Sequence, residues 1–547
     1  MQQQDQKDPG QQPRDSEAGR VDVTRLLQRE PTPPPKWAIA PVEGRVLDPG
    51  TAITVEGVNP RPTVYVGPRL LMSNKVDFAE TLDILRGIAK DLLWSVDPEP
   101  GWDDSTRYGV RRLRLSVASK QAALAPDGWT LLQQARAKYG LERLRGVGLD
   151  HVVFSKPVES DPFDSSHPFD SSHPFDSSHP FDSSHPFDSS HPSSRAGASY
   201  PVSTYAVPGS GGRQPIRCVV PRPTRRSDDE LPGRRPVVAI LDTGCAPHPW
   251  LDDVVDGGVT LDGAAIGYTD PSTAPELVGD VTGPLDGSID PLSGHGTFIA
   301  GLVFQGCPDA DILSWRVVPS EGPLVESDWV AALARIAELV DRDRRGADGG
   351  RRIDVLSLSM GYYHETPEDV LFDPTLLQIL QDLGRNGVNV VCSAGNDATL
   401  RPSFPAAFAP WGNGKGPVKA EPDCVPIVSV GALNPNGTDA LFSNAGSWVR
   451  AYAPGAAVMS TMPAFQGGLL PMARSQVLGR PRESIDPDDF RGGFAVWSGT
   501  SFAAPYLAGR MAAALVDRLP AAGTPETLQT VVDRGRTVVE ELSDIAP

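Results

Sequence analysis

The sequence is poor in cysteine and lacks a recognisable export signal. Its 547 residues include five cysteines, which are scattered and form no CxxC pair. This usage argues against a disulfide framework and favours reduced thiols. The chain starts MQQQDQKDPGQQPRDSE, where no basic segment precedes an apolar stretch, so no secretory signal is expected. We therefore predict a cytoplasmic protein.

Long apolar runs and an excess of positive charge are also missing. No uninterrupted apolar run is long enough to span a bilayer, so no membrane partner is expected. The formal net charge is −19, whereas a nucleic-acid binder needs a basic face for the phosphate backbone. We therefore expect neither a membrane nor a nucleic acid as partner.

The length of the chain exceeds what one hydrophobic core can support, so several domains are expected. Residues 1–45 are rich in Gln, Pro, Arg and Asp and include PTPPPK, which predicts a disordered arm. Residues 46–160 predict a small α/β domain of order β-α-β-α-β. Its expected strands are 63–66, 111–117 and 149–154, and its expected helices are 78–92 and about 127–139.

Five perfect copies of the hexamer FDSSHP follow, from Phe163 to Pro192. A proline at every sixth residue interrupts helices and sheet ladders, and Ser and Asp keep the segment hydrated. We interpret residues 161–235 as a low-complexity linker, with the polar, arginine-rich stretch to Arg235 continuing it. The alternative is a weak metal-binding tract formed by the repeated histidines. These are His167, His173, His179, His185 and His191.

From residue 236 to the end, short apolar strands alternate with helical segments. VVAILD at 237–242 predicts a buried strand, and residues 353–359, 388–394 and 426–432 predict three more. Residues 327–342 have the periodicity of an amphipathic helix, with Ser327 expected as its N-cap. This alternation predicts a mostly parallel sheet with helices on both faces.

Three short motifs in this region carry the chemistry. Asp242 follows the VVAIL strand within DTG, at the sheet edge where open α/β folds place their sites. His295 lies in GHGT, whose glycines allow close approach to the imidazole. Ser501 lies in GTSFAAP ahead of a helical pattern, where helix N–H groups and the helix dipole favour negative charge. Ser501 needs an adjacent base to act as a nucleophile, and histidine is the usual side chain for that role.

These three motifs, in the order Asp–His–Ser, resemble those of the subtilase family over about residues 236–520. The resemblance implies a serine endopeptidase acting through an acyl-enzyme, with a peptide or protein as substrate. It also implies that Asn396, in the segment SAGN, donates to the oxyanion together with the Ser501 N–H. Further residues expected to bind substrate are Ser359, Met360, Gly361, Ser393, Ala394 and Gly395.

Other features of the resemblance are expectations of the same kind. SFPAAF at 403–408 matches the segment that carries a cis-proline in the family, so the Phe404–Pro405 bond is expected to be cis. No oxygen-rich loop supports the structural calcium common in the family, so no metal and no other cofactor is predicted. A polar insertion at about 464–493 is either a disordered loop or a lid.

The function predicted is peptide-bond hydrolysis, and two alternatives stay open. One is a dedicated maturation protease for a single partner peptide, and the other is a catalytically silent peptide-binding pseudoprotease. Residues 46–160 fit either a propeptide-like domain or a recruitment domain. We interpret His248 and His364 as loop or surface histidines outside the catalytic machinery.

Overall fold

The computed structural model describes residues 28–55, 58–103, 109–118, 123–155, 201–282, 287–319, 322–366 and 375–546. The FDSSHP repeats and their histidines lie outside this described part. Within it, no helix combines the length and apolar character needed to cross a membrane.

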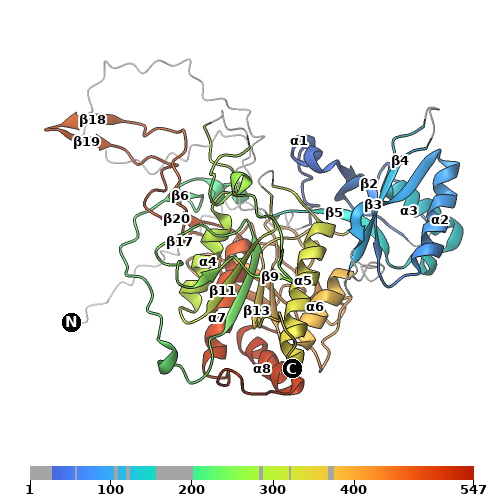
Figure 1. The fold of residues 1–547 in the computed structure, drawn as a ribbon. Helices are drawn as coiled ribbons and strands as arrows, with labels where there is room; N and C mark the ends of the chain where they lie inside the picture. Colours follow the sequence, from blue (N-terminus) through green and yellow to red (C-terminus); the bar gives the residue numbers. More distant parts are fainter. Residues whose placement is uncertain are drawn as a thin grey trace, which may run out of the picture.

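A parallel sheet forms the centre of the larger unit (Figure 1). In the described part it has seven strands in the order β16-β15-β14-β13-β7-β11-β8, and neighbouring strands pair parallel throughout. Residues 237–242, predicted from the apolar run, form β7 over those same residues. The strands are β7 (Val237–Asp242), β8 (Val255–Asp256), β11 (Asp311–Arg316), β13 (Val355–Leu358), β14 (Asn389–Ser393), β15 (Val428–Leu433) and β16 (Ala451–Pro454).

Helices cover both faces of this sheet because its strands are apolar on both sides. In β7, Val238 and Ile240 pack into the core beneath α4 and α7, whereas Ala239 and Leu241 join the core beneath α5 and α6. This two-sided burial is typical of parallel sheets. The helices are α4 (His295–Gly306), α5 (Glu326–Arg345), α6 (Thr375–Arg385), α7 (Thr500–Val516) and α8 (Leu528–Leu542).

Residues 44–153 form a second unit around an antiparallel sheet (Figure 1). Its strand order is β5-β2-β4-β3, and β1 also pairs with β2. The predicted strands and helices are present, and β1 and β3 are additional strands. In chain order the elements are β1 (Gly44–Leu47), β2 (Thr63–Ser73), α2 (Phe78–Asp91), β3 (Trp94–Asp103), β4 (Val110–Val117), α3 (Gly128–Tyr139), the short helix η3 (Glu142–Leu144) and β5 (Val147–Val153).

The two units share a sheet and a core. The strand β12 (Leu324–Val325) of the larger unit pairs antiparallel with β5 of the smaller one. Leu71, Val110 and Val153 of the smaller unit belong to the same apolar cluster as α5. Such burial stabilises the association by removing apolar surface from water.

The N-cap expected at Ser327 is wrong, because α5 begins one residue earlier, at Glu326. Asp150 of β5 accepts hydrogen bonds from the Ser327 backbone N–H (3.0 Å) and from its hydroxyl (2.8 Å). A carboxylate from the smaller unit therefore satisfies an N-terminal amide of α5, as a cap does.

Two polar stretches are more ordered than the sequence predicts. Within the expected arm lie α1 (Lys36–Ile39) and η2 (Ala40–Val42). Within the expected linker, residues 201–235 pack on the larger unit, where Arg225, Arg226 and Arg234 pair with carboxylates of residues 309–354. This stretch holds η4 (Pro201–Ala206), β6 (Gln214–Pro215) and η5 (Asp228–Glu230).

The insertion at 464–493 contains a two-stranded hairpin that projects from the larger unit on the side away from the smaller one (Figure 1). Its strands are exposed throughout. The remaining short elements are β9 (Thr260–Leu261), β10 (Ala264–Ala265), η6 (Pro271–Thr273), η8 (Ala406–Phe408), β17 (Val458–Thr461), β18 (Arg474–Val477), β19 (Arg480–Glu483) and β20 (Phe494–Trp497).

Candidate active site

Asp242 is the last residue of β7, at the carboxyl edge of the central sheet. Its side chain is buried, and its Oδ1 lies 2.6 Å from Nδ1 of His295. The same oxygen accepts a hydrogen bond from the Thr243 backbone N–H (2.9 Å). This arrangement holds the carboxylate against one nitrogen of the imidazole, and a carboxylate in that place stabilises a positive charge on the ring.

His295 is the first residue of α4 and is fully buried. Gly294 precedes it with φ of 86°, a left-handed conformation that glycine adopts without strain. At Gly296, a Cβ atom would lie 2.0 Å from the carbonyl oxygen of Gly244. The two glycines of GHGT therefore let the start of α4 approach the end of β7 closely.

Ser501 is buried in the first turn of α7. Its hydroxyl donates to the backbone oxygen of Ser359 at 3.2 Å. Among the described residues, Nε2 of His295 has no hydrogen-bond partner. His295 and Ser501 therefore share no hydrogen bond in this arrangement, and the Ser501 hydroxyl is directed to a main-chain acceptor.

Asn396 is held against the serine turn by Thr500. Its Oδ1 accepts from the Thr500 N–H (2.9 Å) and from the Thr500 hydroxyl (2.8 Å). The Thr500 hydroxyl in turn accepts from the backbone N–H of Gly395 (3.0 Å). The donor atom of the Asn396 amide is Nδ2, which is the atom that the predicted oxyanion role requires. Thr500 was not predicted, although its position beside Ser501 was a signal.

Glu276 is a further buried group that the sequence did not indicate. Its carboxyl accepts from the hydroxyls of Thr243 and Thr297 and from the backbone N–H of Gly296 (3.0 Å). Burial raises the pKa of Glu276 to about 7, although the hydrogen bonds to its carboxylate act in the opposite direction and lower the pKa. Glu276 thereby ties the residue after Asp242 to the turn that carries His295.

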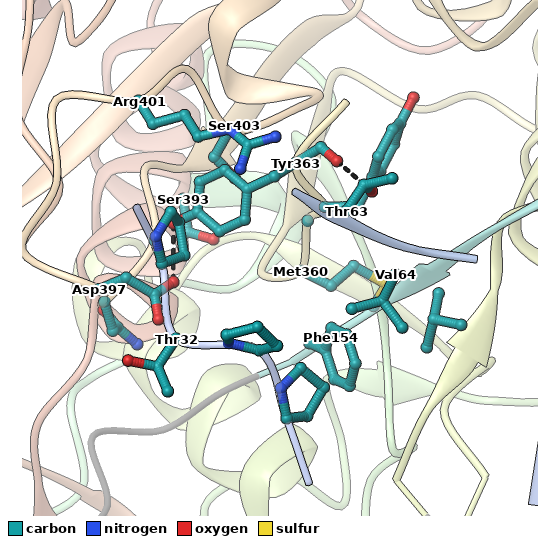
Figure 2. A pocket seen from close by; sticks show the side chains of 18 of the residues that line it. Thr32, Thr63, Val64, Phe154, Met360, Tyr363, Ser393, Asp397, Arg401 and Ser403 are labelled. Carbon is teal, nitrogen blue, oxygen red and sulfur yellow. Dashed lines mark hydrogen bonds between the residues drawn. The ribbon is translucent and has the colours of Figure 1, made fainter. Parts of the chain in front are cut away.

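A cleft beside Ser501 is lined by both units and is shown in Figure 2. Of the predicted substrate-binding residues, Ser359, Met360, Gly361, Ser393 and Gly395 line it. Ala394 is buried instead, with its backbone paired to neighbouring segments. The predicted cis bond between Phe404 and Pro405 is confirmed.

The chain's own β5 extension lies along this cleft. Phe154 and Gly361 exchange two main-chain hydrogen bonds of 3.0 Å, and the Ser155 hydroxyl donates to the oxygen of Ser359 at 3.3 Å. This is the antiparallel pairing by which an extended peptide adds to a sheet edge. A strand predicted to bind peptide is therefore paired with a segment of the same chain.

Part of the N-terminal arm occupies the same cleft, passing Asp397 in Figure 2. Residues 31–34, with sequence PTPP, line it together with Asn396 and Ser501. Just before them, Arg29 accepts a hydrogen bond from Thr399 through its backbone oxygen (2.7 Å). None of the described residues of the 464–493 insertion lines the cleft, so the hairpin is not a lid over it in this structure.

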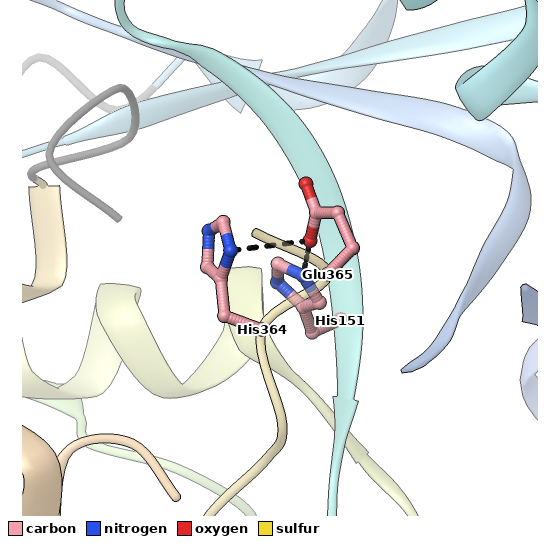
Figure 3. A group of neighbouring side chains, drawn as sticks. All are labelled: His151, His364 and Glu365. Carbon is pink, nitrogen blue, oxygen red and sulfur yellow. Dashed lines mark hydrogen bonds and ion pairs between the residues drawn. The ribbon is translucent and has the colours of Figure 1, made fainter. Parts of the chain in front are cut away.

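A buried histidine joins the two units near the cleft (Figure 3). His151 of β5 lies between two carboxylates, with Nδ1 at 2.5 Å from Glu326 and Nε2 at 2.7 Å from Glu365. Burial alone would lower its pKa, but the two glutamates outweigh burial and raise it to about 10. His151 is thus an imidazolium that links β5 to α5 and to the loop after β13.

His364 completes this cluster; it lies in a loop, which is one of the two predicted settings, and its side chain is buried rather than at the surface. His248 is also buried, and its ring contacts the backbone oxygen of Gly493. His151, His364 and Glu365 are the one group of ligand-type residues in the described part that could hold a metal ion. The two carboxylates on His151, however, require both of its nitrogens to carry protons, which favours an ion pair over a metal ligand.

Replacing His151 should weaken the association of the two units in a pH-dependent way. The folded pKa is raised above the unfolded value near 6.5, so the contribution is complete below pH 6.5 and is lost as pH rises through about 10. We expect His151→Gln to cost about 3–5 kcal/mol at pH 6, because two buried carboxylates lose their cation. The charged and titratable neighbours are Glu326, Glu365, His364 and Tyr362.

Calorimetric melting of the full chain at pH 6 and pH 9.5 checks this expectation. Both chains that are compared carry Ser501→Ala, which prevents self-cleavage. The difference in unfolding free energy between the His151→Gln chain and its parent should be smaller at pH 9.5 than at pH 6. An equal difference at both pH values would show that His151 stabilises the interface by packing alone.

In a comparison with known protein families, residues 233–537 match the subtilase family. The "Major intracellular serine protease" of Bacillus subtilis (strain 168) is 26% identical over 295 residues, which are 51% of this chain and 68% of that protein. The "Intracellular serine protease" of Paenibacillus polymyxa is 28% identical over 292 residues, 51% of this chain and 66% of that protein. The matched region thus covers about two thirds of each relative.

Solved structures are similar over a comparable part of the chain. A "cold adapted subtilisin-like serine proteinase" is 19% identical, with a TM-score of 0.34, and 56% of this chain aligns with 82% of it. A "Lanthipeptide Protease" is 20% identical, with a TM-score of 0.36, and 56% of this chain aligns with 80% of it.

Proposed function

This chain belongs to the subtilase family, so it is a subtilisin-like serine endopeptidase, and we propose that Asp242, His295 and Ser501 are its catalytic triad. The observation that carries the proposal is the contact of 2.6 Å between buried Asp242 and His295, next to a cleft that Ser501 and Asn396 line. A peptide or protein is the substrate that such a site accepts.

The proposed reaction begins when the Ser501 hydroxyl turns from Ser359 to Nε2 of His295. The imidazole takes the hydroxyl proton as Oγ attacks the carbonyl carbon, and Asp242 stabilises the imidazolium that forms. The oxyanion receives hydrogen bonds from Nδ2 of Asn396 and the N–H of Ser501. His295 then gives the proton to the leaving amine, and water releases the acyl group by the reverse sequence of roles.

A digest of a peptide library by the purified full chain tests the proposal, with Ser501→Ala as the control. Cleavage by the parent chain and none by the variant is the expected result. Cleavage of one sequence alone would support a dedicated maturation protease. Peptide binding without cleavage, even in the Glu30→Gln chain described below in which the arm is loosened, would support a silent pseudoprotease and contradict the triad.

We further propose that residues 28–155 hold the enzyme inhibited, which favours a propeptide-like role over recruitment. The support is the pairing of Phe154 with Gly361 and the proline-rich segment 31–34 beside Ser501. A proline-rich segment is stiff and lacks the N–H groups of its prolines, so it fills the cleft without presenting a regular strand to it.

Loosening the arm should therefore expose the nucleophile. Glu30→Gln removes the carboxylate that pairs with buried Arg401, so we expect at least a tenfold faster reaction of Ser501 with a fluorophosphonate probe. The exposed pair Arg145–Glu142 offers a matched control, and Glu142→Gln should leave the labelling rate unchanged. Equal rates in all three chains would contradict inhibition by the arm.

A further inference from the structure

The end of the arm is anchored by one carboxylate between two arginines. Oε1 of Glu30 accepts from Nε (3.0 Å) and Nη2 (2.6 Å) of Arg61, and Oε2 accepts from Nη1 of Arg401 (2.8 Å). The three residues come from three separate segments of the chain. Glu30 directly precedes the proline segment that lines the cleft, and its partner Arg401 lines the cleft as well.

Arg401 is held in place independently of Glu30. Its Nη2 donates to the backbone oxygen of His364 (2.9 Å), and its guanidinium lies 5.1 Å from the centre of the Tyr363 ring. Figure 2 shows Arg401 and Tyr363 on the same wall of the cleft. Carbonyl and ring contacts of this kind fix a planar guanidinium so that one edge stays directed at an anion.

Arg401 is also a buried cation with one anionic partner. Its side chain is 1% exposed, and Glu30 contributes the one carboxylate within 4.0 Å of it in the described part of the chain. Nε of Arg401 has no hydrogen-bond partner among the described residues. Since a buried charge needs a counter-charge, a peptide that displaces the arm binds best when it supplies a carboxylate there.

We propose that Arg401 and Arg61 form a subsite of the cleft for an acidic side chain, and that peptides with glutamate at this subsite are the preferred substrates. The proposal rests on the peptidase function above and names its substrate class. Glu30 is then a built-in mimic of the substrate side chain. Glutamate is favoured over aspartate because the observed occupant reaches both guanidinium groups with a side chain of that length.

Binding of a peptide copy of the arm tests the subsite without relying on turnover. The probe is fluorescent QREPTPPPK, which copies residues 28–36, and its partner carries Gln in place of the glutamate. Both are titrated against the full chain with Ser501→Ala, to prevent cleavage, and Glu30→Gln, to weaken the tethered arm. We expect the glutamate peptide to bind at least tenfold more tightly than the glutamine peptide.

The arginine variants give the specific readout. In Arg401→Gln the preference for the glutamate peptide should fall to about one, while binding of the glutamine peptide stays within about threefold. A loss of both peptides alike would assign Arg401 a purely structural role and overturn the proposal. If Arg401→Gln does not fold, the more exposed Arg61→Gln decides, and an unchanged preference there overturns the two-arginine subsite.

Cleavage assays distinguish failure of the acidic subsite from failure of the proposed peptidase function. The assay uses the Glu30→Gln chain with Ser501 intact and pairs of peptides that carry either Glu or Gln at one position, with each position tested in turn. At one of these positions, kcat/KM should be at least tenfold higher for the Glu peptide than for the Gln peptide. A binding preference without any cleavage would uphold the subsite and contradict the peptidase function. Cleavage with equal kcat/KM at every position would uphold the peptidase and overturn the subsite.

Discussion

Ser501→Ala should reduce peptide hydrolysis by about a millionfold, because the attacking oxygen is removed and the other triad members act only through it. The comparison is made in the Glu30→Gln background, where the arm competes less with added peptide. The measurement is kcat for a peptide cleaved by the parent chain.

Ser475→Ala is a suitable control, since Ser475 lies on the exposed hairpin strand β18. That chain should retain the parent activity. A Ser501→Ala chain that keeps more than about a hundredth of the activity would mean that another residue is the nucleophile.

Asn396→Ala should lower kcat by about a hundred- to a thousandfold and leave KM little changed, because the oxyanion forms only beyond the ground state. The substitution also removes the acceptor of two hydrogen bonds from Thr500. A loss of order around Ser501 could therefore imitate the loss of an oxyanion donor.

Asn396→Asp separates the two effects. Aspartate keeps an acceptor for Thr500 but replaces the amide donor with a negatively charged oxygen. We expect this chain to melt like the parent and to lose at least as much kcat as Asn396→Ala. Recovery of kcat in the aspartate variant would make Asn396 a positioning residue for the serine turn.

The elements that the sequence predicted best are those whose pattern is set by burial. The apolar run 237–242 forms β7 because both faces of a central parallel strand are covered. The strand β3 was missed because WSVDPEPGWD contains two prolines. It lies at the edge of its sheet, where a missing N–H does not interrupt the ladder.

The parts that sequence reasoning missed depend on partners far away in the chain. Asp150 caps a helix that starts more than 170 residues later, and Glu30 pairs with Arg401 at a separation of 371 residues. The polar stretch 201–235 suggested a linker, because its arginines find their carboxylates only in the folded larger unit. Local patterns carry no information about such pairs.

The candidate site shows the same division. The motifs indicated which residues of the larger unit lie together, and Asp242 and His295 are in contact. They did not indicate that the chain fills its own cleft, nor that the Ser501 hydroxyl donates to Ser359 while the cleft is filled. Glu276 was missed because a lone glutamate in a loop has no distinguishing pattern.

The most direct test of the triad is to locate the adduct of a fluorophosphonate probe on the full chain by mass spectrometry. We expect one adduct per chain, on Ser501. In the Asp242→Asn chain, which lacks the carboxylate that contacts His295, this adduct should form about ten thousandfold more slowly. An adduct on another residue, or no adduct even in the Glu30→Gln chain, would contradict the assignment of Ser501 as the nucleophile.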